Sequence, residues 1–120
     1  MKLAGDILVG LVGLLHAWFL VLEMFLWDKP YGRKTFGLTP EYAAASKSLA
    51  ANQGLYNGFL AAGLAWGLWL GSTATGTSIK IFFLGCVVVA GLYGGMTVSR
   101  KIYAVQALPG IVALLLIVLA

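Results

Sequence analysis

Two ionisable side chains interrupt the first apolar run of this sequence at helical spacing. Glu23 is a lone carboxylate near the end of that run, and His16 precedes it by seven residues. Seven residues are about two helical turns, so the two side chains share one helix face with Val12 and Phe19. Ionisable groups inside an apolar segment are costly and are therefore functional candidates. We assign Glu23 and His16 as the candidate catalytic residues, with Glu23 as acid, base or charge partner.

Amide and phenol side chains in the other apolar runs form a second set of candidates. A rise of 1.5 Å per helical residue places Glu23 and several of these groups roughly 5–10 Å below one membrane surface, with His16 and Asn57 deeper. This depth pattern predicts a polar layer contributed by all four helices. The candidate ligand-binding residues are Asn52, Gln53, Tyr56, Asn57, Tyr93 and Gln106.

Each candidate also has a structural interpretation. Glu23 can serve as a staple that pairs with a loop cation, Arg33 or Lys34. His16 can be a neutral core histidine bonded to a carbonyl or to Asn57. The amide side chains can act as interhelical contacts worth about 1 kcal/mol or less each.

Several classes of chemistry find no support in the sequence. Nucleotide-binding loops, zinc motifs and nucleophile elbows are absent. The lone Cys86 excludes an internal disulfide and a cysteine-based metal site. A haem cofactor would use His16 as its axial ligand, although a single helical histidine is a weak signal. No other metal site is predicted.

The composition indicates that lipid is the main solvent of the chain. Apolar residues make up 61% of its 120 residues and charged residues 10%, against roughly 45–50% and about 25% in soluble domains. The net charge of +4 does not indicate nucleic-acid binding, because the basic residues cluster beside apolar runs as orientation signals do. We therefore expect a single integral membrane domain.

Hydropathy predicts an all-α, four-helix bundle. Spanning the bilayer takes roughly 20 helical residues. Thr39, Pro40 and Glu41 read as the start of a helix that continues into the second span. Pro109 should loosen the fourth helix and free a carbonyl near Val105. The predicted spans are 7–27, 43–71, 79–98 and 102–120, and 28–41 is predicted to be a cytoplasmic loop.

The distribution of Lys and Arg predicts the orientation. Six of the eight basic residues flank the second and fourth spans on one side, whereas Lys2 and Lys80 lie on the other. Cytoplasmic loops carry the excess of positive charge, so both termini are expected outside. The six are Lys29, Arg33, Lys34, Lys47, Arg100 and Lys101.

Glycines recur at four-residue spacing in the second and third spans. Small residues at this spacing let helices approach closely in lipid. We expect tight packing within the bundle, and a homo-oligomer through the remaining glycine-rich faces. These glycines are Gly54, Gly58, Gly63, Gly67, Gly71, Gly91 and Gly95.

Three sequence blocks resemble a known family. LEMFLW (22–27), GRKTFGLTPE (32–41) and ANQGLYNGFLAAG (51–63) are similar to small bacterial membrane proteins filed as domain of unknown function 1304. The resemblance covers essentially the whole chain. It implies a multi-pass protein of the bacterial inner membrane with four spans, and it implies no activity.

Three functions are compatible with these residues. The favoured hypothesis is a polar pocket in the cytoplasmic half of the bundle that binds or modifies a small lipophilic molecule. The second is a proton-coupled exporter, by analogy with small multidrug transporters, although Glu23 lies nearer the cytoplasmic end than theirs. The third is an accessory subunit whose polar layer binds a partner helix.

Overall fold

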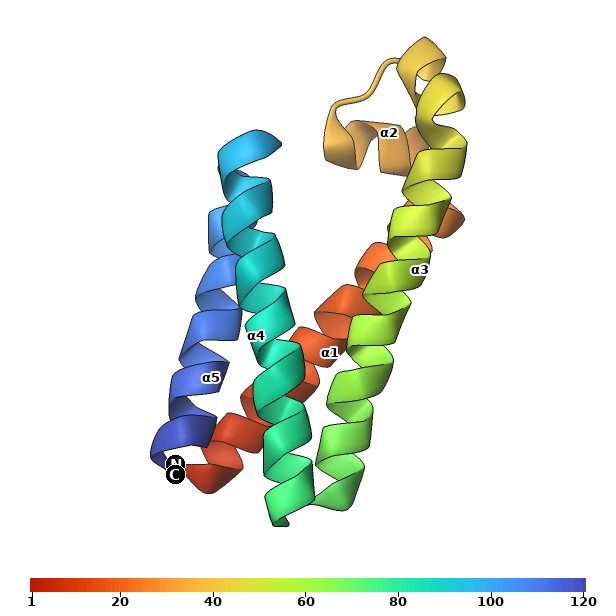
Figure 1. The fold of residues 1–120 in the computed structure, drawn as a ribbon. Helices are drawn as coiled ribbons and strands as arrows, with labels where there is room; N and C mark the ends of the chain where they lie inside the picture. The colour runs from red at the N-terminus through yellow and green to blue at the C-terminus, as the bar shows by residue number, and fades with distance from the viewer. The chain divides into compact units, whose positions relative to one another are not determined.

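Helices account for nearly the whole chain. The computed structural model describes all 120 residues, and it contains no strand (Figure 1). The all-α prediction is therefore confirmed. In chain order the elements are α1 (Lys2–Met24), α2 (Pro30–Phe36), α3 (Pro40–Leu70), α4 (Ala74–Thr97), the π-helical segment η1 (Tyr103–Ala107) and α5 (Leu108–Leu119).

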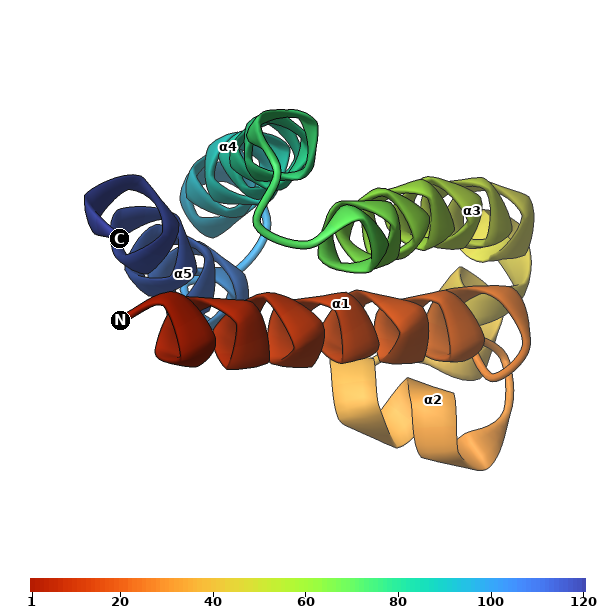
Figure 2. The ribbon, with the colours of Figure 1, turned by 90° about the horizontal axis from the view of Figure 1, so that it is seen from below.

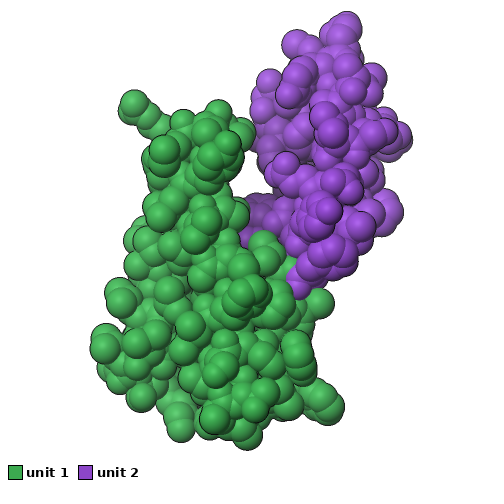
Figure 3. Space-filling model, in the orientation of Figure 1, with its two compact units in different colours: residues 1–14, 60–120 green, residues 15–59 purple.

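The chain divides into two compact units (Figure 3). Unit 1 contains residues 1–14 and 60–120, and unit 2 contains residues 15–59. The long helices α1 and α3 contribute residues to both units. Helices α4 and α5 lie in unit 1, and α2 lies in unit 2.

Unit 1 has an apolar core to which four helices contribute. Its fully buried side chains include Val9 of α1, Leu64 of α3, Leu84 of α4 and Ala113 of α5. Helices α4 and α5 run side by side, as Figures 1 and 2 both show. The sequence reaches this packing through aliphatic residues that recur every three or four positions, which places them on one helix face.

Close helix approach in unit 1 depends on glycine. A Cβ at Gly91 would lie 2.7 Å from the backbone nitrogen of Ala107, and one at Gly67 would lie 2.7 Å from Cγ of Lys80. Gly63 and Gly95 similarly leave room for the rings of Phe83 and Tyr103. The prediction of tight glycine packing within the chain is confirmed at these four positions.

Gly71 has a different role from the one predicted. Its φ of 69° is left-handed, and an added Cβ would meet no atom within 4 Å. It therefore ends α3 rather than packing against a helix, and its assignment to the packing stripe was wrong. Only glycine adopts this conformation without strain.

The π-helical segment η1 ends two residues before Pro109. The backbone N–H of Leu108 donates to the carbonyl of Tyr103, five residues earlier. Proline supplies no N–H and its ring crowds the preceding turn, and such a site is where a helix widens into a π-turn. The predicted loosening of the final helix takes the form of this wider turn, and a freed carbonyl near Val105 stays a prediction.

Unit 2 contains the end of α1, the whole of α2 and the first part of α3. The segment 28–41, predicted as a loop, contains the two-turn helix α2. Pro30 occupies its first turn, where a missing N–H costs nothing, and Gly37 ends it with a φ of 66°. Gly32 is buried against the carbonyl of Leu26, where a Cβ has no room. The connection between α1 and α3 therefore contains a helix that the prediction of a loop did not include.

The start of α3 follows the sequence prediction. Thr39 accepts a hydrogen bond from the backbone N–H of Tyr42 at 3.1 Å, and Pro40 is the first helical residue. Ser46, one turn after Tyr42, accepts a hydrogen bond from the indole N–H of Trp27 at 3.0 Å. An ion pair between Lys47 and Asp28 at 3.1 Å lies beside it.

Two helices are long and apolar enough to cross a membrane. They are α1 and α4, and the stretch Tyr103–Leu119 forms a shorter apolar helix. α3 has the length but lacks the same apolarity, because its first half carries Glu41, Lys47 and several amides. These properties support a membrane location and leave the number of spans as a proposal.

Candidate functional site

The buried carboxylate of Glu23 is the centre of the polar cluster in unit 2. Glu23 belongs to the last turn of α1, and only 6% of its surface is exposed. The side-chain amide of Gln53 donates to its Oε2 at 2.8 Å. The side-chain amide of Asn57 donates to its Oε1. Both carboxylate oxygens are thus bound by neutral donors from α3.

Helical spacing and two glycines create this arrangement. Gln53 and Asn57 are four residues apart, so both project from one face of α3. A Cβ at Gly54 would lie 2.7 Å from Cγ of Met24 and 3.1 Å from Cβ of Glu23. A Cβ at Gly58 would lie 2.6 Å from Leu20. The glycines therefore bring α3 within the reach of short amide side chains.

No cation pairs with Glu23. The ion pairs of the structure are Asp28–Lys47 and Asp6–Lys80. Arg33 and Lys34, proposed as partners of a staple, make no ion pair with Glu23, and the Nε atom of Arg33 is buried without a hydrogen bond. The staple interpretation is therefore wrong, and the amide ligands replace the expected cation.

His16 lies two turns before Glu23 on α1. It has no exposed surface, and its ring packs edge-on against Phe19 with centroids 5.2 Å apart. A haem or substrate would have to displace packed side chains to reach the imidazole, so ligation by His16 stays a prediction. No group of three or more His, Cys, Asp and Glu side chains is placed to hold a metal ion.

The remaining candidates are spread over both units. Asn52 and Tyr56 are exposed, and the Tyr56 ring contacts Phe59 at 5.5 Å. In unit 1, Tyr93 is 68% exposed, and the Gln106 amide donates to the carbonyl of Val87 at 3.1 Å. The structure thus joins Glu23, Gln53 and Asn57, whereas a shared layer with Tyr93 and Gln106 stays a prediction.

Comparison with known proteins identifies the family. Residues 10–118 match the family described as "Protein of unknown function (DUF1304)". The chain belongs to this DUF1304 family. It is also similar to "Uncharacterized protein YpaA" of Lactococcus lactis subsp. lactis (strain IL1403), with 31% identity over 117 residues that cover 96% of this chain and 97% of that protein. No solved structure matches the chain. The family predicted from three sequence blocks is confirmed.

Sequence reasoning missed one polar site of this DUF1304 protein. Lys80 was counted only as an orientation charge, yet it is 2% exposed and its ammonium donates to Asp6 at 2.8 Å and to the carbonyl of Gly71 at 3.2 Å. Asp6 lies just before the predicted first span, 7–27, whereas α1 begins at Lys2 and includes Asp6. The signal in the sequence was that Asp6 and Lys80, which have opposite charges, each lie at the start of a predicted span.

Proposed function

We propose that this DUF1304 protein is a four-span protein of the bacterial inner membrane that binds or modifies a small lipophilic molecule at Glu23. The observation that carries the proposal is a buried carboxylate whose two oxygens are held by Gln53 and Asn57 and by no cation. Such a group is polar, oriented and not committed to a structural ion pair.

The surface of the chain supports the membrane part of the proposal. Large apolar side chains are exposed along α1, α4 and α5, including Leu14 at 70%, Phe82 at 64% and Leu115 at 53%. Exposed apolar patches of this extent are a liability in water. Lipid contact accounts for them, and the apolar lengths of α1 and α4 agree with it.

The chemistry at Glu23 supports the ligand part. In an apolar environment a carboxylate gains from any hydrogen-bond donor or positive group that approaches it. The amides of Gln53 and Asn57 fix the orientation of the carboxylate, and a polar atom of the ligand can replace or supplement one of them. Ligand pockets typically combine an apolar lining with a few placed polar groups of this kind.

Native mass spectrometry of the detergent-purified protein tests the proposal. We expect the wild-type protein to retain a small molecule, and Glu23→Gln to lose it while keeping its thermal stability. An optical spectrum of the same sample reports any coloured cofactor. A wild-type protein without a bound molecule, or identical occupancy in both proteins, would refute the proposal.

Proton-coupled export is the second candidate, and the same carboxylate favours it. A group held by neutral amides can accept a proton without breaking an ion pair. In this case a pH gradient across proteoliposomes should drive uptake of a lipophilic amine dye, and Glu23→Gln should abolish it. Uptake that is equal in empty and protein-containing liposomes would eliminate this candidate.

A further inference from the structure

A second polar site lies entirely within unit 1, at the ion pair between α1 and α4. The Asp6 carboxylate and the Lys80 ammonium are 2.8 Å apart, and the Lys80 side chain is 3% exposed. Lysine has three N–H donors. Two are used, by Asp6 and by the carbonyl of Gly71, so one donor of a buried cation is left for a further acceptor.

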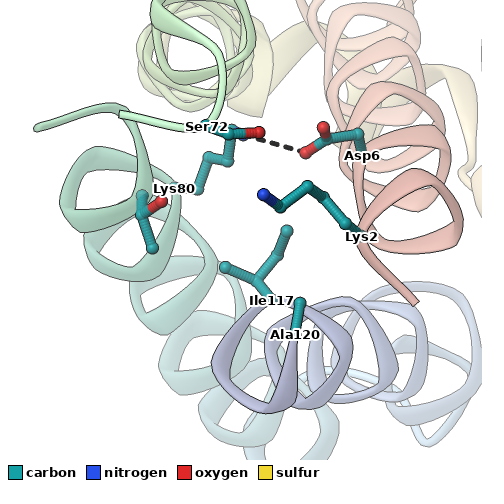
Figure 4. A pocket seen from close by; sticks show the side chains of 7 residues that line it. Lys2, Asp6, Ser72, Lys80, Ile117 and Ala120 are labelled. Carbon is teal, nitrogen blue, oxygen red and sulfur yellow. Dashed lines mark hydrogen bonds and ion pairs between the residues drawn. The ribbon is translucent and has the colours of Figure 1, made fainter. Parts of the chain in front are cut away.

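This pair forms one wall of a cavity of about 200 Å³. Figure 4 shows the Lys2 side chain extending into the same space from the first turn of α1. Lys2 makes no ion pair or side-chain hydrogen bond within the chain. The lining residues are Lys2, Asp6, Ser72, Thr77, Lys80, Ile117 and Ala120.

Charge and size restrict what this cavity can hold. The lining side chains carry two ammonium groups, those of Lys2 and Lys80, and one carboxylate, that of Asp6. The hydroxyls of Ser72 and Thr77 add neutral donors. The volume is smaller than the roughly 300–1,000 Å³ of pockets for drug-sized ligands. A compact anion with several acceptor oxygens therefore fits better than a bulky apolar molecule.

We propose that this cavity binds a phosphate group, either free or as the headgroup of an anionic lipid. Phosphate presents several strong acceptor oxygens, and lysine binds it as a point charge. The ammonium of Lys2 and the third N–H of Lys80 supply charged donors, while Ser72 and Thr77 supply hydroxyls. The Asp6–Lys80 pair holds the buried ammonium in place. This site is independent of Glu23 and of the function proposed for it.

The first experiment measures thermal stabilisation of the detergent-purified full chain. One arm titrates inorganic phosphate against chloride at constant ionic strength. The other compares mixed micelles containing phosphatidylglycerol with micelles containing phosphatidylcholine. Stabilisation by inorganic phosphate indicates a site open to free anions, whereas stabilisation by phosphatidylglycerol alone indicates a lipid headgroup. No stabilisation in either arm would overturn the proposal.

Charge variants then show whether the cavity is responsible. Lys2→Gln should weaken binding about tenfold or more, since it removes one charged hydrogen bond. Lys101→Gln removes the same charge from an exposed position outside the cavity and should leave binding unchanged. Equal weakening by both variants would indicate nonspecific charge attraction and would refute the site.

Asp6→Asn gives an effect of opposite sign. It removes the negative charge that competes with the ligand for Lys80, so phosphate affinity should rise even if the apo protein is less stable. A purely structural ion pair would lose stability with no gain in affinity, and that result would contradict the proposal. If this variant fails to fold, the comparison of Lys2→Gln with Lys101→Gln alone decides the proposal.

Discussion

At the scale of single residues, the amide ligands of Glu23 separate a structural role from a functional one. Replacing Glu23 by Gln keeps the shape and leaves one oxygen to accept a hydrogen bond. Interhelical side-chain hydrogen bonds in membranes are worth about 1 kcal/mol or less. We expect Glu23→Gln to lower the free energy of unfolding by no more than about this amount, while ligand binding or transport is lost.

Glu23→Leu provides the comparison. Leucine offers no acceptor, so the amides of Gln53 and Asn57 lose their partner. A buried donor left unsatisfied costs about 1–3 kcal/mol; since Gln53 is exposed and Asn57 is partly buried, this cost falls mainly on the amide of Asn57. Thermal unfolding of both variants beside the binding assay measures the difference. Lower stability with full activity in Glu23→Gln would exclude this residue from the site.

The ion pair of Asp28 with Lys47 predicts a response to acid. The hydrogen bond from Lys47 holds the pKa of the Asp28 carboxyl below its ordinary value of 3.8. A carboxyl with a lowered pKa in the folded state stabilises the protein above its unfolded pKa and loses this effect as the pH falls through the folded one. Lys47→Met should therefore make the unfolding midpoint less dependent on pH below about 4. Midpoints measured from pH 3 to 6 test this, and since Lys47 is exposed the effect should be small.

At the scale of helices, α4 contains a glycine that packs and one that does not. A Cβ at Gly91 would meet the backbone of Ala107 at 2.7 and 2.9 Å, and backbone atoms have little freedom to move away. Overpacking of this kind costs about 1–3 kcal/mol. Gly91→Ala should destabilise the protein by that amount in thermal unfolding.

Gly85 is the matched control on the same helix. An added Cβ there meets nothing within 4 Å, so Gly85→Ala should leave stability unchanged or raise it, because alanine favours helix. Equal effects of the two substitutions would show that helix propensity, not the contact with Ala107, determines the result. Gly58→Leu should also destabilise the protein, because the added side chain meets the end of the Leu20 side chain.

The helices themselves were largely predictable from sequence, and their ends were not. Apolar runs locate α1, α3, α4 and the final helix, and Thr39 and Pro40 give the start of α3. The predicted first span begins at residue 7, whereas α1 begins at Lys2 and includes Asp6, whose charge is paired with Lys80, 74 residues away. α2 was not predicted because a helix of two turns is too short to show a periodic pattern. It is stabilised by the close contact of Gly32 with the backbone of Leu26.

The site was predictable only in part for the same reason. Spacing along one helix correctly grouped Gln53 with Asn57 and His16 with Glu23. Which face of α3 meets α1 depends on where the backbones approach, and that is decided by Gly54 and Gly58 together. Asn52 and Tyr56 were therefore included, although only Gln53 and Asn57 donate hydrogen bonds to Glu23.

At the scale of the whole molecule, the charge distribution predicts the orientation of the proposed four-span chain. Six of eight basic residues flank two connections, and such connections stay in the cytoplasm. A periplasmic reporter fused after Ala120 should therefore be active. The control is the same reporter inserted at Gly37, where the structure leaves space, and it should be inactive. The opposite pattern would reverse the orientation.

The ion pair between Asp6 and Lys80 also bears on the order in which the chain assembles. Seventy-four residues separate the partners, so at about 5–20 residues per second the carboxylate waits roughly 4–15 s for its cation during synthesis. Throughout that interval the first helix lacks the contact that holds its beginning against α4. Its early placement must rely on its hydrophobicity and on the basic residues that follow it, and the ion pair forms only after α4 has been synthesised.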